Sequence, residues 1–281
     1  MTSLLQTLQK RILVEKAYWE RTYRDWKQFP ENPFAKKALK QKTGCSHLLC
    51  QYKSPILHHQ NFKTRLQNIK LAVNSLDGIT IEPNQIFSFF HLIGKPKKKL
   101  GYKLGLHFDQ DRLIRSFEAG LGQLASVIYY LALLADLKIL EHHSGKVSLE
   151  GFDFAYIPLG FEACITWGYR DLRFQNSFPF RIALQFHINH NELVTTMYGE
   201  KPEKISAVLS AETFSPLPFQ TQTVPFTQYP QHTKGSVLVK GSEGCTVRLL
   251  RKIIQKDEME SSKTIAEHQY QAVDRMVLSK N

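Results

Sequence analysis

A long apolar segment in the middle of the chain constrains the fold more than any other feature. In "SFEAGLGQLASVIYYLALLA" (Ser116–Ala135), a turn with two spaced glycines leads into a helical run without a charged residue from Gln123 onward. Because apolar residues surround this helix on nearly all sides, it belongs in a core rather than on a surface. The run is well short of the roughly 20 residues that span a bilayer. The sequence therefore predicts a central buried helix of a folded domain.

Helical and strand patterns occupy different parts of the chain. Apolar residues in 62–76 are spaced by four, three, four and three, which is typical of an amphipathic helix. "LHF" and "RLIRSF" flank the acidic turn "DQD" and predict a hairpin. After the central helix come short segments with strand character: "LKIL", "EACITWGY", "DLRFQN", "FRIALQFHIN" and "ELVTTMYG". The order predicts an α+β fold with the central helix packed on a mainly antiparallel sheet.

Three regions are predicted along the chain. Residues 1–60 form a basic helical N-terminal region, residues 61–203 the main domain, and residues 204–281 a linker and β-hairpin extension. Residues 203–233 are rich in Pro, Thr, Ser and Gln, which favours a linker or an irregular arm. The extension is expected to be a hairpin of "GSVLVKG" and "GCTVRLLRKII", which turns at "GSEG".

The N-terminal helix has an aromatic face. Trp19, Tyr23 and Trp26 fall at positions i, i+4 and i+7. We expect this face to pack on the main domain. The alternative is that residues 1–42 present an aromatic and basic surface that contacts a membrane or nucleic acid.

The balance of charge points to an anionic partner. The 281 residues carry a formal net charge of +12, which favours nucleic acid, a membrane surface or another polyanion. No nucleic-acid-binding motif of a recognised kind is visible, so sequence-specific nucleic-acid binding is not expected. We also expect no secretory signal, because the N-terminus lacks a continuous apolar stretch. Four scattered cysteines do not suggest a disulfide framework, so a cytoplasmic location is expected.

Several motifs share their order and spacing with one known family. "NIKLAVNSLDGITIEPNQIFSF" (Asn68–Phe89), "GKPKKKLGYKLGL", the central helix and "DLRFQN" together resemble the VanW family, named for an accessory protein of vancomycin-resistance gene clusters. The resemblance covers residues 61–203 and departs at Asn84 and Gln85, where the family usually has Gly-Glu.

Two further departures concern chemistry. Gly122 stands where family members typically carry a cysteine, and in "EHHSGK" His143 matches the family's first histidine while Gly145 replaces its second. A cysteine at a helix N-terminus with a histidine on a following strand is the arrangement of papain-like thiol catalysis. If the family uses it, the resemblance implies that this chain lacks both the nucleophile and its base.

Ser126 and His143 are the remaining, weak catalytic candidates. Ser126 lies one helical turn after Gly122. A hydroxyl inside a buried helix more often bonds to the chain itself. Cys164 lies in "EACITWG", where a cysteine is usually a small core residue.

A ligand site without catalysis is the main alternative. The free amides at a Gly-x-Gly helix start can hold a carboxylate or a phosphate. In "DLRFQN", Asp171 and Arg173 share one face of a strand, where they either compensate each other locally or point into a cleft beside the glycine turn. The candidate ligand-binding residues are Gly120, Gly122, Gln123, His143, Asp171 and Arg173.

Two other clusters remain open. Lys97, Lys98 and Lys99 form an anion-binding loop or a solvated charge cluster that only aids solubility. Cys45, His47 and Cys50, with His58 and His59 nearby, have a spacing at the edge of what zinc sites use. No metal and no cofactor are assigned from the sequence.

These features together predict a non-catalytic accessory or binding protein. The family resemblance implies a link to cell-envelope or glycopeptide-resistance functions, with an anionic small molecule or cell-wall precursor as ligand. The alternative is a hydrolase or acyl-transferase with a papain-like cleft that acts on peptide-like cell-wall material.

Overall fold

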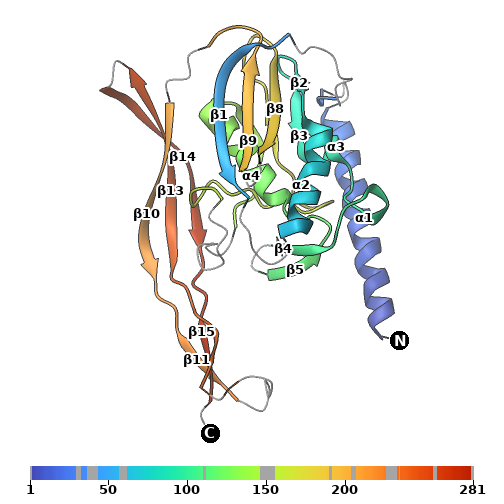
Figure 1. Cartoon of the computed structure of the whole chain (residues 1–281), viewed down its shortest axis with the longest axis vertical. Coiled ribbons are helices and arrows are strands. Elements are labelled where there is room, and N and C mark those ends of the chain that lie inside the picture. The colour runs from blue at the N-terminus through green and yellow to red at the C-terminus, as the bar shows by residue number, and fades with distance from the viewer. Residues whose placement is uncertain are drawn as a thin grey trace. The chain divides into compact units, whose positions relative to one another are not determined.

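The protein has an α+β fold that divides into two compact units (Figure 1). The computed structural model describes residues 2–29, 33–36, 44–56, 62–109, 112–145, 156–189, 192–203, 207–225, 233, 235–255 and 258–279. Unit 1 comprises Met1–His143 and Glu162–Ala207, and unit 2 comprises Ser144–Phe161 and Val208–Asn281.

Unit 1 combines helices with antiparallel sheets. Its helices are α1 (Thr2–Gln28), α2 (Phe62–Leu76), α3 (Phe89–Ile93) and α4 (Leu121–Leu134), with a 3-10 turn at Lys98–Leu100. Its strands are β1 (His47–Pro55), β2 (Ile79–Ile81), β3 (Ile86–Ser88), β4 (Gly105–Asp109), β5 (Arg112–Ser116), β6 (Lys138–Glu141), β7 (Arg173–Gln175), β8 (Ile182–Asn189) and β9 (Glu192–Gly199). The main sheet has the order β1-β9-β8-β2, a second sheet has the order β3-β7-β6, and β4 and β5 form the hairpin expected around "DQD".

The central helix is buried, as its apolar surface predicts. Helix α4 packs on β1 and β9 of the main sheet and is also in contact with α2 (Figure 1). Gly120 precedes it with a φ of 89°, in the left-handed region. A Cβ at this position would lie 3.0 Å from the Arg65 carbonyl oxygen. Both the backbone angle and the close approach of α2 therefore require glycine here.

The N-terminal region differs from the expectation in two ways. Residues 47–55 are a strand rather than a helix, because β1 pairs along its length with β9. Helix α1 forms, but its aromatic face is largely exposed instead of buried against the domain. Trp19, Tyr23 and Trp26 are 65%, 64% and 67% exposed. The orientation of the helix is instead set by ion pairs. Arg21 pairs with Glu141, and Asp25 pairs with Arg173.

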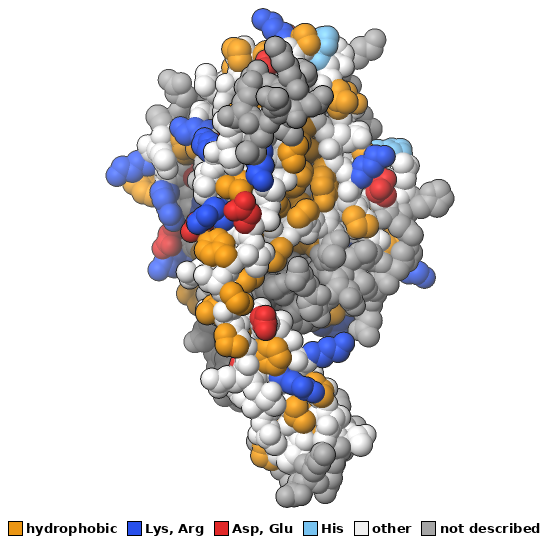
Figure 2. All heavy atoms as spheres, turned by 90° about the vertical axis from the view of Figure 1, so that its left-hand side faces the viewer, with side chains coloured by type: hydrophobic (Ala, Val, Ile, Leu, Met, Phe, Trp, Pro, Cys, Tyr) orange, Lys and Arg blue, Asp and Glu red, His pale blue; other side chains and the backbone are white. Residues whose placement is uncertain are grey.

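The described part of unit 2 consists mainly of strands. They are β10 (Ala207–Leu217), β11 (Thr221–Val224), β12 (Val237–Val239), β13 (Gly244–Gln255), β14 (Glu258–Tyr270) and β15 (Arg275–Leu278). One sheet has the order β10-β13-β14 and the other β11-β15-β12. On the face in Figure 2, hydrophobic side chains are interspersed with lysine and arginine side chains.

Two expectations about this region are wrong. Residues 203–233, predicted to be a linker or an irregular arm, contain β10 and β11, because these segments pair with strands that lie later in the chain. The C-terminal hairpin joins β13 to β14, whereas β12 pairs with β15, so the strands on either side of "GSEG" belong to different sheets. Strand β14 has mostly exposed positions, and its polar sequence lacks the apolar alternation that marks a strand.

Within the residues that the structure describes, no helix has the length and apolar character of a membrane span.

Candidate functional site

The glycine turn at the start of α4 is held by buried hydrogen bonds. The Gln123 Nε2 donates to Ser54 Oγ and to the Pro55 carbonyl, both at 2.8 Å. The Gln123 Oε1 accepts a hydrogen bond of 3.0 Å from Arg65 Nη2. Gln123 is buried, so its side chain joins β1 and α2 to the first turn of α4.

Ser126 is bonded to the backbone. Its Oγ donates to the Gly122 carbonyl at 2.7 Å and accepts from the Ala163 amide at 2.8 Å. His143 Nε2 instead lies 3.0 Å from Glu141 Oε1. The Ser126 hydroxyl is thus bonded to backbone groups and the His143 ring to Glu141. Ser126 is also fully buried. This is the geometry of a serine that bonds within its own helix rather than of an activated nucleophile.

Gly122 leaves room for a side chain. A Cβ built at this position meets one atom within 4 Å among the described neighbours, the Ala163 carbonyl oxygen at 3.9 Å. Gly122 is half-buried and lies in the first turn of α4. The site that the family resemblance assigns to a cysteine is therefore sterically open.

A Gly122→Cys variant is expected to fold normally and to gain a reactive thiol, because a helix N-terminus lowers the pKa of a cysteine. Mass spectrometry after brief iodoacetamide treatment should find Cys at 122 alkylated about tenfold faster than Cys in a Ser126→Cys control. The control position lies one turn further along α4 and is fully buried. Equal rates at the two positions would contradict the proposed accessibility of the turn.

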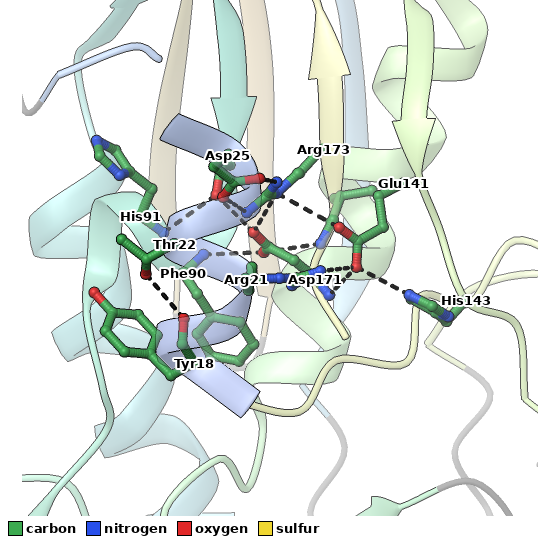
Figure 3. Close-up of polar contacts among 12 residues, drawn as sticks. Tyr18, Arg21, Thr22, Asp25, Phe90, His91, Glu141, His143, Asp171 and Arg173 are labelled. Atoms are coloured by element: carbon green, nitrogen blue, oxygen red, sulfur yellow. Dashed lines mark hydrogen bonds and ion pairs between the residues drawn. The ribbon is translucent and has the colours of Figure 1, made fainter. Parts of the chain in front are cut away.

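A second set of residues, here called the Arg173 cluster, joins three segments of unit 1 (Figure 3). The Arg173 guanidinium donates two parallel hydrogen bonds to Asp25 of α1, at 2.7 and 2.8 Å. Its Nε donates to Asp171 Oδ2 at 3.1 Å and lies 3.5 Å from Glu141 Oε2. Arg21 of α1 forms an ion pair with Glu141. The cluster therefore consists of Arg21, Asp25, Glu141, Asp171 and Arg173.

Local structure fixes Asp171 in this cluster. Its Oδ2 accepts a 2.6 Å hydrogen bond from Ser88 Oγ, and its Oδ1 accepts one of 3.0 Å from the Phe90 amide at the start of α3. The Asp171 amide in turn donates to Glu141 Oε1 at 2.8 Å. Asp171 is 1% exposed, so the carboxylate depends on these partners for its solvation.

The surrounding charges set the ionisation of the cluster. Burial raises the pKa of Glu141, but the hydrogen bond from His143 and the charge of Arg21 outweigh it, so the pKa lies below its usual value. Burial works to lower the pKa of Arg173, but the hydrogen bonds to Asp25 and the charge of Asp171 raise it further above its already high value. Both side chains are therefore charged at neutral pH.

Glu141 should make the stability of unit 1 dependent on pH. Because its folded-state pKa lies below the unfolded value of 4.5, its stabilising contribution is complete above pH 4.5 and is lost as the pH falls through the folded-state pKa. Urea unfolding at several pH values should show a smaller loss on acidification for Glu141→Gln than for the wild type. Glu20→Gln, in a largely exposed pair with Lys16, should follow the wild type. Identical pH profiles for Glu141→Gln and the wild type would contradict this assignment.

A cavity of about 460 Å³ lies beside the cluster. Aromatic and charged side chains of α1, α3 and β7 line it, together with Trp167. Trp167 stacks on Tyr18 at 4.6 Å and meets Phe90 edge to face at 5.4 Å. Its buried Nε1 has no hydrogen-bond partner in the described part of the chain.

None of the described residues that line the cavity belongs to the Gly120–Gln123 turn. Asp171 and Arg173 thus face a cavity under α1, whereas the expected cleft lay beside the turn.

The lysine loop lies outside this cavity. Lys97, Lys98 and Lys99 are exposed, and the last two belong to a 3-10 turn. The nearby Lys95 forms an ion pair with Glu15 of α1. The three lysines are therefore accessible to a large anion.

Cys45 and Cys50, the cysteines of the possible zinc motif, are both buried. Burial raises the pKa of the Cys45 thiol to about 11 and that of Cys50 to about 12, while His47 is exposed. Among described residues, no group of three potential metal ligands is found. His58 and His59 lie outside the described residues. Cys164 is half-buried in an irregular segment rather than a strand, and its amide donates to the His143 carbonyl.

Sequence patterns did not reveal four residues of this site: Arg21, Asp25, Glu141 and Trp167. Asp25 and Arg173 are 148 residues apart, so no local spacing connects them. The one available signal was Glu141, which directly precedes the histidine pair in "EHHSGK".

The region of this chain that is similar to known proteins includes the glycine turn, Glu141, Asp171 and Arg173. A family model described as "VanW like protein" matches residues 64–198. The uncharacterized protein YoaR of Bacillus subtilis is 28% identical over 137 residues, which cover 49% of this chain and 44% of YoaR. The vancomycin B-type resistance protein VanW of Enterococcus faecalis is 25% identical over 140 residues, half of each chain. The matches thus span about half the length of these curated relatives.

Among solved structures, the G5 domain of IgA1 protease is similar to 27% of this chain and 89% of its own length, with 22% identity and a TM-score of 0.17.

Proposed function

Since residues 64–198 belong to the VanW family, we propose that this chain is a non-catalytic accessory or binding protein linked to cell-envelope or glycopeptide-resistance functions. The alternative, a hydrolase or acyl-transferase, lacks support from the position of Ser126. That hydroxyl is fully buried and bonded to the backbone on both sides.

The cavity beside the Arg173 cluster carries this proposal. Ligand sites in proteins are concave and largely apolar, with a few fixed polar groups that orient the ligand. Here Phe90 and Trp167 supply apolar walls, and Arg173 supplies a fixed charge. Ser88 is one of the hydroxyl residues that line the cavity, and its Oγ already donates to Asp171 and caps α3. The arrangement therefore favours binding over covalent chemistry.

The ligand that suits this cavity is a small anionic molecule, such as a cell-wall precursor with a free carboxylate. Guanidinium groups bind carboxylates through two parallel hydrogen bonds, which gives both affinity and orientation. Cell-wall peptides end in such a group, and the E. faecalis relative is named as a vancomycin resistance protein.

Isothermal titration calorimetry with soluble cell-wall peptides tests the proposal. The wild type should bind saturably, and mass spectrometry should recover the peptides unchanged. Trp26→Ala should weaken binding, because Trp26 lines the cavity. Trp19→Ala is a matched control, since Trp19 is equally exposed on α1 but does not line the cavity. Cleaved or transferred peptide, or no binding at all, would contradict the proposal.

We also propose that α1 contacts an anionic membrane surface within residues 1–42. Its exposed side chains include large apolar residues with exposures of 57–67%: Ile12, Leu13, Trp19, Tyr23 and Trp26. Tryptophan and tyrosine favour the membrane interface, where the ring is buried and the polar atom stays wet. Exposed Arg24 and Lys27 on α1 and the loop Lys97–Lys99 would attract anionic headgroups.

Sedimentation with liposomes containing phosphatidylglycerol tests the membrane contact. A Trp19→Ala/Tyr23→Ala variant is expected to reduce the bound fraction severalfold, because each substitution removes exposed aromatic area. Leu104→Ala, which removes an exposed apolar side chain elsewhere, should bind as the wild type does. Equal sedimentation of the aromatic variant and the wild type would remove α1 as the contact.

A further inference from the structure

We propose that Arg173 and Trp167, at the wall of this cavity, form a binding site for aromatic carboxylates and that α1 occupies both residues as a built-in competitor, with Asp25 in the place of the ligand carboxylate. This inference rests on the proposed binding function for its biological setting and names the class of ligand.

The hydrogen bonds of Arg173 divide into an inner and an outer set. Its Nε faces Asp171 and Glu141, which lie on the same domain as Arg173 itself. Its Nη1 and Nη2 both donate to Asp25, one to each carboxylate oxygen. This is the bidentate geometry with which arginine binds free carboxylates. These two terminal nitrogens are called the outer fork of Arg173. Within the described residues, only α1 accepts hydrogen bonds from this fork.

Arg173 with its inner neighbours and the helix that occupies its outer nitrogens come from different parts of the chain. Phe90, Glu141, Trp167, Asp171 and Arg173 all lie within residues 64–198, the part that matches the family model. Helix α1 lies outside that match. In Figure 3, Asp25 and Arg21 reach from α1 toward Arg173 and Glu141. The matched region therefore supplies Arg173 and Trp167. The N-terminal helix supplies Asp25 and Tyr18, which contact them.

The contacts of Tyr18 define the second part of the ligand. Tyr18 is seven residues before Asp25, so the two side chains lie on the same side of α1. Its ring stacks on Trp167 at 4.6 Å with an interplanar angle of 20°. Trp167 is 8% exposed, and its Nε1 is a buried donor without a hydrogen-bond partner among the described atoms. An aromatic ring against Trp167 and a carboxylate on Arg173 are therefore the two elements that a ligand must reproduce.

Competition by α1 lowers the apparent affinity for any such ligand. A ligand that needs the outer fork of Arg173 binds only when Asp25 has moved away, so its affinity falls with the fraction of open molecules. Removal of the Asp25 carboxylate should therefore create a carboxylate-binding site in the intact chain.

Full-length Asp25→Ala provides the test, with 3-phenylpropionate as the probe and its neutral amide as the matched control compound. In calorimetry and thermal unfolding, 3-phenylpropionate should bind Asp25→Ala at least about tenfold more tightly than the wild type and raise its Tm. The amide should do neither. Glu15→Ala removes another carboxylate of α1, one that pairs with Lys95 and does not line the cavity, and should behave as the wild type.

Equal affinity of Asp25→Ala and the wild type, or equal binding of the acid and the amide, would overturn the inference. If Asp25→Ala does not fold, the near-isosteric Asp25→Asn serves in the same titration, because it also removes the carboxylate from the fork. The outcome is independent of the cell-wall proposal. Tight binding of the probe without binding of cell-wall peptides would refute the cell-wall ligand and leave the competitor role of α1 intact.

Discussion

An Asp171→Ala variant is expected to lose about 3–5 kcal/mol of the free energy of unfolding of unit 1. Asp171 is 1% exposed, and its carboxylate accepts hydrogen bonds from Ser88, Phe90, Leu172 and Arg173. Truncation leaves three of these donors without that acceptor and leaves the buried Arg173 with fewer negative partners. A buried charge that loses a partner costs more than the same loss at a surface.

Urea unfolding followed by tryptophan fluorescence measures this loss, since Trp19, Trp26 and Trp167 all lie in unit 1. Glu82→Ala is the matched control: it removes a carboxylate from a solvent-exposed pair with Arg181 and should cost less than about 1 kcal/mol. Similar losses for Asp171→Ala and Glu82→Ala would show that the cluster is weakly coupled to the fold.

An Asn68→Ala variant should destabilise unit 1 by about 3 kcal/mol. Asn68 is fully buried in α2, and its Nδ2 lies 2.9–3.1 Å from the carbonyl oxygens of Lys103, Phe117 and Ala119. Its Oδ1 accepts from the Lys103 amide at 2.8 Å. One side chain therefore satisfies backbone groups on both sides of the β4–β5 hairpin and just before Gly120. Without it, these buried groups lose their partners.

Gln67→Ala is the control for this variant. Gln67 is adjacent in α2, and its Nε2 makes one exposed hydrogen bond, to the Gly101 carbonyl. Its loss should cost no more than about 1 kcal/mol. Asn68→Asp should also destabilise the fold, because a carboxylate cannot donate to the three carbonyl groups. A loss below 1 kcal/mol for Asn68→Ala would indicate that water replaces the amide.

The sequence indicated two residues of the site, Asp171 and Arg173, but not the partners that surround them. The alternation in "DLRFQN" places Asp171 and Arg173 on one side of the chain, and the structure brings them within 3.1 Å of each other. The proposal that they compensate each other locally describes only the inner half of the arrangement. The outer half depends on Asp25, which has no periodic relation to Arg173 and could not be paired with it from one sequence.

The orientation of α1 shows the same limit. Helical periodicity correctly places Trp19, Tyr23 and Trp26 together, but burial of the largest apolar face was the wrong criterion for docking. The helix docks through Tyr18, Arg21 and Asp25, because the buried charges of Arg173 and Glu141 require partners. Those charges become buried only in the tertiary structure.

The sequence alone determined the features that depend on neighbouring residues. These are the buried helix α4 with its glycine entry, the β4–β5 hairpin, the α+β class and the similarity of residues 64–198 to the VanW family. Local periodicity and turn chemistry act within a few residues, so they can be recognised without a fold.

Only the tertiary structure decided which face of α1 docks and which strands pair in unit 2. It also decided that the outer fork of Arg173 meets Asp25. Ion pairs and strand pairing join groups that are far apart in the chain, and their energies depend on a burial that exists only after folding.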